Sequence, residues 1–157
     1  MANDNEKLDF LKLAKECYDI AENVVKEGEV TTYAEQHFTS EDASIKNSMI
    51  TEGCRVYGNV EHSVLFSGVT IGKGAVVKDS VILPNTRIED GAVVEYAIIG
   101  QETVIGAGAK VGCSKEEAMA TVQPGPMAGY MAVIGDEITV GENQIVKAGE
   151  MLAQDRN

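Results

Sequence analysis

The 157-residue chain is long enough for one domain, and its hydrophobic share of 44% is sufficient to build a core. A formal net charge of -12 makes the surface acidic, so it repels nucleic-acid phosphates, and we expect no nucleic-acid partner. The sequence contains no apolar run of membrane-spanning length and begins with the acidic stretch MANDNEKLDF, which predicts a cytoplasmic protein that binds no membrane. The three cysteines are far apart and lack C-x-x-C spacing, which predicts reduced thiols and suggests neither a disulfide framework nor a zinc site.

The first element expected along the chain is an amphipathic α-helix within residues 1–29, with Gly28 placed as its C-cap. Residues 30–42 show no clear period and are expected to form an extended linker. Because repeat folds need terminal caps, we expect the helix to cap the open end of the domain that follows; docking to a partner is the alternative. The apolar stripe of the helix comprises Phe10, Leu13, Ala14, Cys17, Ile20, Ala21 and Val24.

An internal repeat of seventeen residues fills the middle of the chain. The stretch IGKGAVVKDSVILPNTR, residues 71–87, is followed by the similar stretch IEDGAVVEYAIIGQETV, residues 88–104. Upstream the offset shortens to fifteen, and downstream aliphatic residues recur every six positions. The aligned aliphatic columns are Val60, Val77, Val94 and Val111; Ile71, Ile88 and Ile105; and Leu65, Ile82 and Ile99.

Within each repeat the aliphatic residues step by six or five positions, which fits neither an α-helix nor a half-buried strand. Short strands joined by turns on the three faces of a coil would give this step, with one aliphatic side chain per strand pointing inward. Glycine, alanine and serine columns suit the tight positions beside it. The pattern is the hexapeptide signature of an all-β parallel β-helix, here of about six coils over residues 43–157, and its left-handed form is known from that association.

Residues 113–132 interrupt the repeat and carry the turn sequence QPGP. We expect a loop that leaves the β-helix before its last coil and begins with one helical turn capped by Ser114. Such a loop is either functional or a plain connection, and the plain connection is the interpretation we favour.

The sequence offers little catalytic chemistry. Many β-helices of this kind are acyltransferases that use a surface histidine as general base, and His62 is the candidate here. His62 shares an outward column with Asp79 and Tyr96, so an ordinary surface residue is the interpretation we favour. A carbonic anhydrase of the γ class needs three zinc-ligating histidines, whereas the chain has only His37 and His62, so we expect no metal and no cofactor.

Five motifs of the repeat are specific. They are the Lys46-Asn47-Ser48 start, the TEGC stretch of residues 51–54, the VEHSVLF run of residues 60–66, the following GKGAVVKDSVILPNT and the AIIG of residues 97–100. Together they resemble the C-terminal β-helix of bacterial glucose-1-phosphate adenylyltransferases, the ADP-glucose pyrophosphorylases. The resemblance covers residues 43–112 strongly and residues 133–152 more loosely, and it extends to regulatory subunits of that enzyme.

The resemblance implies an activity whose catalytic part is not in this sequence. In the family, ADP-glucose for glycogen synthesis is made by an N-terminal α/β domain with a Gly-rich phosphate loop and metal-binding aspartates. The GKGAVV stretch starting at Gly72 lies inside a predicted coil instead of at a strand-to-helix turn, so it is not a phosphate loop. No catalytic residue carries over, and the chain is either a stand-alone β-helix protein or a fragment.

The resemblance therefore implies a non-catalytic module for oligomerisation or regulation, which self-associates or binds a nucleotidyltransferase subunit. A sugar-phosphate effector would need clustered basic side chains. The candidates are dispersed among acids, so solvated surface is the favoured interpretation of each. The alternative function is an acyltransferase that uses His62. The effector-binding candidates are Arg55, Lys73, Lys78 and Arg87, with Lys110 also on the coils.

Overall fold

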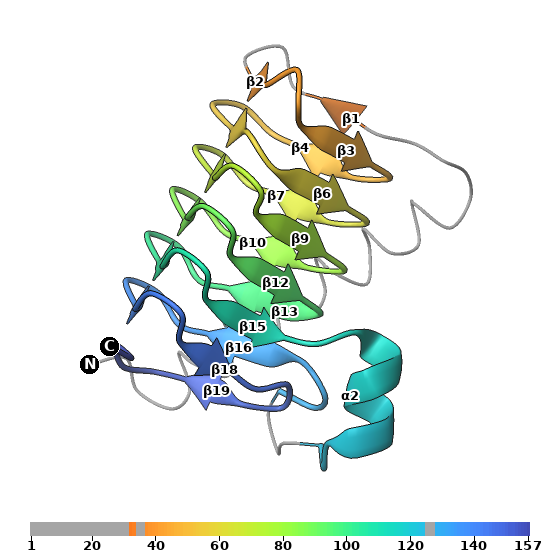
Figure 1. The fold of residues 1–157 in the computed structure, drawn as a ribbon, viewed down its shortest axis with the longest axis vertical. Coiled ribbons are helices and arrows are strands. Elements are labelled where there is room, and N and C mark those ends of the chain that lie inside the picture. The colour runs from red at the N-terminus through yellow and green to blue at the C-terminus, as the bar shows by residue number, and fades with distance from the viewer. Residues whose placement is uncertain (1–31, 34–36, 125–127) are drawn as a thin grey trace.

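The computed structural model describes residues 32–33, 37–124 and 128–157. These residues form a parallel β-helix in which the chain winds through three sheets in turn (Figure 1). The predicted all-β parallel β-helix is confirmed. The helix expected within residues 1–29 and the thiol of Cys17 lie outside the described residues.

Every third strand belongs to the same sheet, and every pairing between neighbours is parallel. Sheet A consists of β1 (Thr32–Tyr33), β4 (Met49–Ile50), β7 (Val64–Leu65), β10 (Val81–Ile82), β13 (Ala97–Ile99), β16 (Ala132–Ile134) and β19 (Met151–Leu152). Sheet B consists of β2 (Phe38–Thr39), β5 (Arg55–Val56), β8 (Thr70–Ile71), β11 (Arg87–Ile88), β14 (Val104–Ile105) and β17 (Thr139–Val140). Sheet C consists of β3 (Ser44–Lys46), β6 (Asn59–Glu61), β9 (Val76–Lys78), β12 (Val93–Glu95), β15 (Lys110–Gly112) and β18 (Ile145–Val146).

The three aliphatic columns of the sequence are the inner ladders of the three sheets. Val77 pairs with Val94 in sheet C, Ile71 with Ile88 in sheet B, and Ile82 with Ile99 in sheet A. Members of all three ladders are buried and belong to one core cluster that runs the length of the coil. Burial of each Val or Ile side chain stabilises the fold by roughly 1.5–3 kcal/mol, so the stack of coils holds together through its shaft.

The glycine column marks a turn that other residues adopt only with strain. Gly74, Gly91 and Gly108 have φ values of +67°, +69° and +67°, in the left-handed region. The alanines that follow them, including Ala75 and Ala92, are fully buried beside the inner ladders. The position just before each strand of sheet C has room only for a small side chain, and alanine fits there.

The β-helix begins earlier than the sequence indicates. Strands β1 and β2 lie within residues 30–42, where we expect a linker, and they pair with β4 and β5. They pair at an offset of seventeen, but Tyr33 and Thr39 occupy the positions aligned with the buried Ile50 and Val56, so the aliphatic column that marks the later coils is missing here. Sheets B and C each contain six strands and sheet A seven, in agreement with about six coils.

The expected interruption contains helix α2 (Lys115–Thr121), whose first turn is capped by Ser114. The hydroxyl of Ser114 accepts a hydrogen bond from the backbone N–H of Glu117, as predicted for an N-cap. The chain rejoins sheet A at β16, where Ala132 already pairs with Ala97. No helix in the described part of the chain is long and apolar enough to cross a membrane.

Candidate functional site

One corner of the coil carries the outward column that contains His62. Asn47, His62, Asp79 and Tyr96 occupy equivalent positions in four successive coils, with φ values of 46°, 49°, 47° and 50°. Each of the last three donates its backbone N–H to the coil before it; that of His62 bonds to Lys46 O at 3.0 Å. This corner therefore holds its side chains in a fixed stack along the outside of the molecule.

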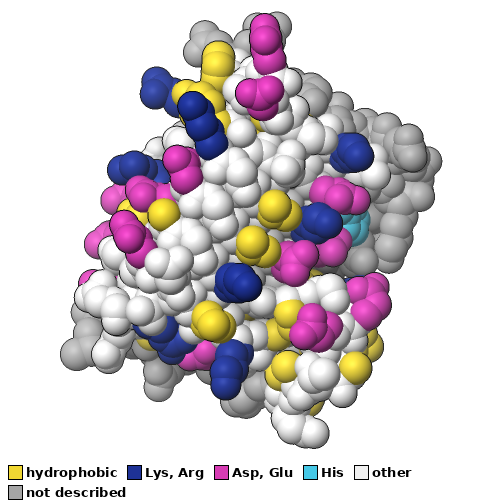
Figure 2. All heavy atoms as spheres, viewed as in Figure 1, with side chains coloured by type: hydrophobic (Ala, Val, Ile, Leu, Met, Phe, Trp, Pro, Cys, Tyr) yellow, Lys and Arg dark blue, Asp and Glu magenta, His cyan; other side chains and the backbone are white. Residues whose placement is uncertain are grey.

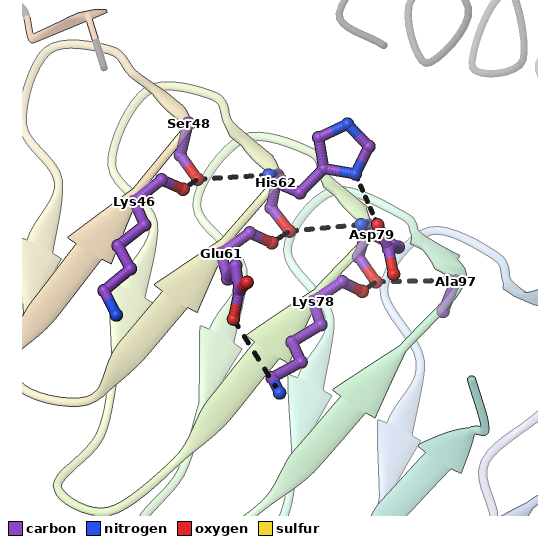
Figure 3. Close-up of polar contacts among 9 residues, drawn as sticks. Lys46, Ser48, Glu61, His62, Lys78, Asp79 and Ala97 are labelled. Atoms are coloured by element: carbon purple, nitrogen blue, oxygen red, sulfur yellow. Dashed lines mark hydrogen bonds and ion pairs between the residues drawn. The ribbon is translucent and has the colours of Figure 1, made fainter. Parts of the chain in front are cut away.

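A ladder of buried serines lies directly beside this column (Figure 3). The hydroxyl of Ser63 donates to the carbonyl of Glu61 at 2.8 Å and accepts from the backbone N–H of Ser80 at 3.1 Å. Ser48 and Ser80 repeat the arrangement one coil before and one coil after. The ladder satisfies corner N–H groups that have no backbone partner of their own, and it ends where Ala97 replaces serine.

His62 pairs with a carboxylate from the next coil. Its Nδ1 lies at hydrogen-bond distance from Oδ1 of Asp79 (Figure 3), and the two side chains are 25% and 36% exposed. A hydrogen on Nδ1 donated to Asp79 leaves Nε2 as the nitrogen that can accept a proton. The two residues share a column of the repeat, but the column alone does not predict that they pair.

Lys78 lies on sheet C, apart from Arg55, Lys73 and Arg87. It is aligned with Glu61 on one side and Glu95 on the other, and its Nζ lies 3.8 Å from Glu61 Oε2. Two acidic neighbours offset its charge, so Lys78 is a poor anchor for an anion. The favoured interpretation of Lys78 as solvated surface is consistent with this geometry.

The structure brings two of the basic candidates together. Lys73 and Arg87 line a surface groove of about 430 Å³ along sheet B, together with Tyr57, Glu89 and Asp90. Arg87 Nη2 lies 3.1 Å from Glu89 Oε1, and the backbone N–H of Lys73 donates to Asp90 Oδ1 at 2.8 Å. The groove therefore presents two cations and two carboxylates, and the sequence pattern did not single out its tyrosine or its acids.

Arg55 lies in the same sheet but outside this groove. It is exposed on β5, and the register places Thr70 between it and Arg87. Figure 2 shows basic and acidic side chains interspersed over the visible face, without a field of a single sign. The described residues contain no group of three or more His, Cys, Asp and Glu side chains that could hold a metal ion.

A second hollow of about 520 Å³ lies near the C-terminal coil, lined by residues that include Lys147, Glu150 and Arg156. The Arg156 guanidinium donates to both carboxylate oxygens of Glu150, and this hydrogen bonding lowers the pKa of Glu150 below its ordinary value of 4.5. The pair ties the chain end to the turn before β19. The two charges compensate each other within the protein, so the pair offers little net charge to a ligand.

The two described cysteines are free thiols. Burial raises the pKa of the Cys54 thiol, and burial together with the carboxylates of Glu117 and Glu95 raises the pKa of Cys113. A raised pKa keeps both thiols protonated at neutral pH, so neither is an activated nucleophile.

Similar proteins define the family of the β-helix. The glucose-1-phosphate adenylyltransferase of Clostridium perfringens is 47% identical over 110 residues, which are 70% of this chain and 26% of that enzyme. The same enzyme of Fervidobacterium nodosum is 34% identical over 114 residues, or 69% of this chain and 28% of the relative. The chain thus spans about a quarter of the length of these relatives, and the match lies in their C-terminal region.

Solved structures with a similar course of the chain share little sequence with it. The GDP-perosamine N-acetyl transferase of Caulobacter crescentus aligns with a TM-score of 0.46 and 15% identity, over 81% of this chain and 50% of that one. The acetyltransferase domain of PglB from Neisseria gonorrhoeae aligns with a TM-score of 0.42 and 21% identity, over 77% of this chain and 53% of that one. At these scores the likeness bears on neither activity nor substrate.

Residues 32–124 match the family described as GlmU-like, C-terminal hexapeptide. The matched range runs from β1 through the capped helix α2, and so takes in most of the repeat and the serine ladder. Hexapeptide repeats of this family are associated with the left-handed form of the β-helix. The chain belongs to the GlmU-like, C-terminal hexapeptide family, and its repeat is related to the C-terminal region of glucose-1-phosphate adenylyltransferases.

Proposed function

We propose that this chain is a non-catalytic assembly or regulatory module that works with a nucleotidyltransferase subunit in ADP-glucose and glycogen synthesis. The observation that carries the proposal is 47% identity to a glucose-1-phosphate adenylyltransferase over a segment that makes up only 26% of that enzyme. The described part of the chain is consistent with such a role, because acidic and basic side chains are interspersed on the visible face and the two described thiols are protonated. The module contributes contacts, and its partner contributes the chemistry.

Any response of the module to a small anion is expected to depend on the groove of Lys73 and Arg87. Both cations face the same hollow, and Tyr57 offers a ring on which a sugar can stack. Glu89 and Asp90 oppose tight binding of an anion, so we expect weak binding of glucose 1-phosphate. Isothermal titration calorimetry measures this binding. The double variant Lys73→Glu, Arg87→Glu should show no heat of binding, whereas Lys78→Glu on sheet C should show the same heat as the unaltered chain.

The proposal is tested by capture and reconstitution. The tagged chain is purified from lysate of its source cells, and partners are identified by mass spectrometry. We expect a glucose-1-phosphate adenylyltransferase in stoichiometric amount. Purified partner is then assayed for ADP-glucose formation with and without the chain, and with the chain after heat denaturation as control.

A change in activity, subunit number or effector response that only the folded chain produces would support the module. Recovery of the chain with itself alone, together with an unchanged reconstituted enzyme, would overturn the proposal. Capture of an unrelated protein without an effect on ADP-glucose formation would count against it as well.

An acyltransferase is the second candidate, and the pairing of His62 with Asp79 is the observation that favours it. The carboxylate on Nδ1 orients the ring and leaves Nε2 for general base catalysis. His62 lines neither of the two hollows described above, so no acceptor site is defined beside it. The function is tested by measuring the release of free coenzyme A from acetyl coenzyme A in the presence of amino sugars. Turnover by the unaltered chain that His62→Asn abolishes would support an acyltransferase.

A further inference from the structure

Side chains of alternating charge form a row on the outside of sheet C. They come from the last residues of β3, β6, β9 and β12, and the strand register places each beside the next. Charged side chains of both signs follow one another on the face visible in Figure 2, and Figure 3 shows three members of the row on one side of the sheet. The four residues, which we call the charge ladder, are Lys46, Glu61, Lys78 and Glu95.

The charge ladder is open to solvent. Lys46 is exposed and Glu95 is half-buried, while the side chains of Glu61 and Lys78 are 52% and 44% exposed. Each residue of the ladder alternates along its strand with a residue that points into the shaft, so its own side chain points outward. This face of the coil is therefore available for contact with another molecule.

Ion pairs within one chain use only the middle of the charge ladder. Lys78 Nζ lies 3.8 Å from Glu61 Oε2, and an exposed pair of this kind contributes little to stability. Lys46 and Glu95, at the two ends, form no ion pair with any residue that the structure describes. The two ends of the ladder thus carry opposite charges that remain open to a partner.

The order of the charges makes the ladder complementary to its own reverse. Two identical faces meet through a two-fold axis, so that every contact occurs twice. An axis parallel to the strands reverses the order of the coils and places the charge ladder opposite itself. Lys46 then faces Glu95 of the second copy, and Glu61 faces Lys78, so all four positions meet an opposite charge.

The other outward row of sheet C allows two such faces to approach. In the same four coils it consists of short, uncharged side chains, and the two valines are half-buried, so a second copy would remove apolar surface from water. A two-fold axis along the coil would place the charge ladder opposite this uncharged row and leave its charges unpaired. The four residues of the row are Ser44, Asn59, Val76 and Val93.

The charge balance of the face favours a second copy. The chain has a formal net charge of -12, so two copies repel each other at long range, but the two lysines and two glutamates of the ladder cancel. At an ionic strength of about 0.15 M the screening length is about 8 Å, which weakens the long-range repulsion more than the attraction of charges in contact. Four strands about 4.8 Å apart span about 14 Å, so the interface is small and the dimer is weak.

We propose that two copies of this chain associate through sheet C with their coils antiparallel, and that the charge ladder sets the register. Pairs of Lys46 with Glu95 lie at both ends of the contact, and pairs of Glu61 with Lys78 lie at its centre. The groove on sheet B stays free in this dimer. The inference needs no second protein, so it is independent of the proposed function and is tested with the purified chain alone.

Exchange of charges along the ladder tests the proposal, with sedimentation velocity of the full chain up to about 0.5 mM, where a small interface associates. Glu95→Lys places a lysine opposite Lys46 at both ends, so we expect the dissociation constant of the dimer to rise at least about tenfold. Addition of Lys46→Glu restores opposite charges between copies, so the double variant should recover the dimer. Within one chain the double variant puts like charges side by side, so a role of the ladder inside a single chain predicts no recovery.

The matched control is Glu102→Lys, which changes the net charge by the same amount. Glu102 is exposed at the corner between β13 of sheet A and β14 of sheet B, away from sheet C, and its substitution should not raise the dissociation constant. A chain that stays monomeric, a dimer that Glu95→Lys leaves intact, or a double variant that stays dissociated would each overturn the proposal. The central exchange, Lys78→Glu with and without Glu61→Lys, gives the same comparison if the first exchange disturbs folding.

Disulfide formation between copies measures the orientation independently. In the antiparallel register position 44 faces position 93 of the second copy, whereas two copies of position 44 lie about 14 Å apart. A chain that carries Ser44→Cys and Val93→Cys should therefore form covalent dimers on oxidation, with at least about a tenfold lower yield for either single variant. These chains also carry Cys17→Ser and Cys113→Ser, and Cys54 stays because it is 1% exposed. Equal yields in the single and double variants would overturn the antiparallel arrangement.

Discussion

Asp79 accepts a hydrogen bond from Nδ1 of His62 across two successive coils, and both residues have left-handed backbone conformations. The backbone at this corner limits what can replace the histidine. Asparagine enters the left-handed region readily, whereas a β-branched residue does so at a cost of about 1–2 kcal/mol.

We therefore expect His62→Val to lower the free energy of unfolding by about 1–2 kcal/mol more than His62→Asn does. The urea midpoint of the full chain measures the difference. Asn59→Val serves as the control, because position 59 is an exposed strand residue of β6 where valine is favoured. Equal midpoints for the two His62 variants would show that the corner relaxes to accept valine.

The serine ladder gives a second prediction. Ser63→Ala removes the oxygen that accepts from the buried N–H of Ser80, and a buried unsatisfied donor costs about 1–3 kcal/mol. Ser67→Ala, at a half-buried position outside the ladder, should change the free energy of unfolding by less than about 0.5 kcal/mol. Similar destabilisation in both variants would mean that the hydroxyl network contributes nothing specific.

Two glycines with similar positive φ values allow the cost of a strained φ to be separated from the cost of a steric clash. Gly74 has φ +67° and open space where a Cβ would lie, whereas Gly112 has φ +74° and would place a Cβ 2.0 Å from the carbonyl oxygen of Glu95. Gly74→Ala should cost about 1 kcal/mol from the left-handed backbone alone. Gly112→Ala should cost clearly more in the same thermal denaturation, because backbone atoms of β12 and β15 must separate.

The Glu150–Arg156 pair predicts a pH dependence of stability. The Arg156 hydrogen bonds lower the pKa of Glu150 in the folded state, so the pair contributes its full stability above the ordinary pKa of 4.5. That contribution is lost as the pH falls through the lower folded pKa. Without Arg156 the pKa of Glu150 is no longer lowered by this hydrogen bond. We therefore expect Arg156→Met to make the decrease of the thermal midpoint between pH 5 and pH 3 smaller. Arg87→Met removes an exposed pair with Glu89 and serves as the control, with a much smaller effect.

The repeat itself was predictable from the sequence because each coil buries the same positions. A column such as Val77 and Val94 has to stay aliphatic wherever a strand points into the shaft, and Gly74 and Gly91 have to allow a left-handed turn. Strands β1 and β2 were not predicted because Tyr33 and Thr39, and not aliphatic residues, occupy the positions aligned with Ile50 and Val56. Pairing to β4 and β5 by backbone hydrogen bonds requires no particular side chain, so it leaves no pattern.

For the candidate site residues, the tertiary structure determines more than the sequence does. The sequence by itself determined that the chain is a β-helix, that Ser114 caps a helix in the interruption, and that His62 and Asp79 share a column. Only the tertiary structure decided that Lys73 and Arg87 face one groove while Lys78 lies between two glutamates on another sheet. It also decided that outward valines and an isoleucine of sheet A are buried. The repeat specifies whether a side chain points in or out, whereas the distance between outward residues depends on how the corners of successive coils turn.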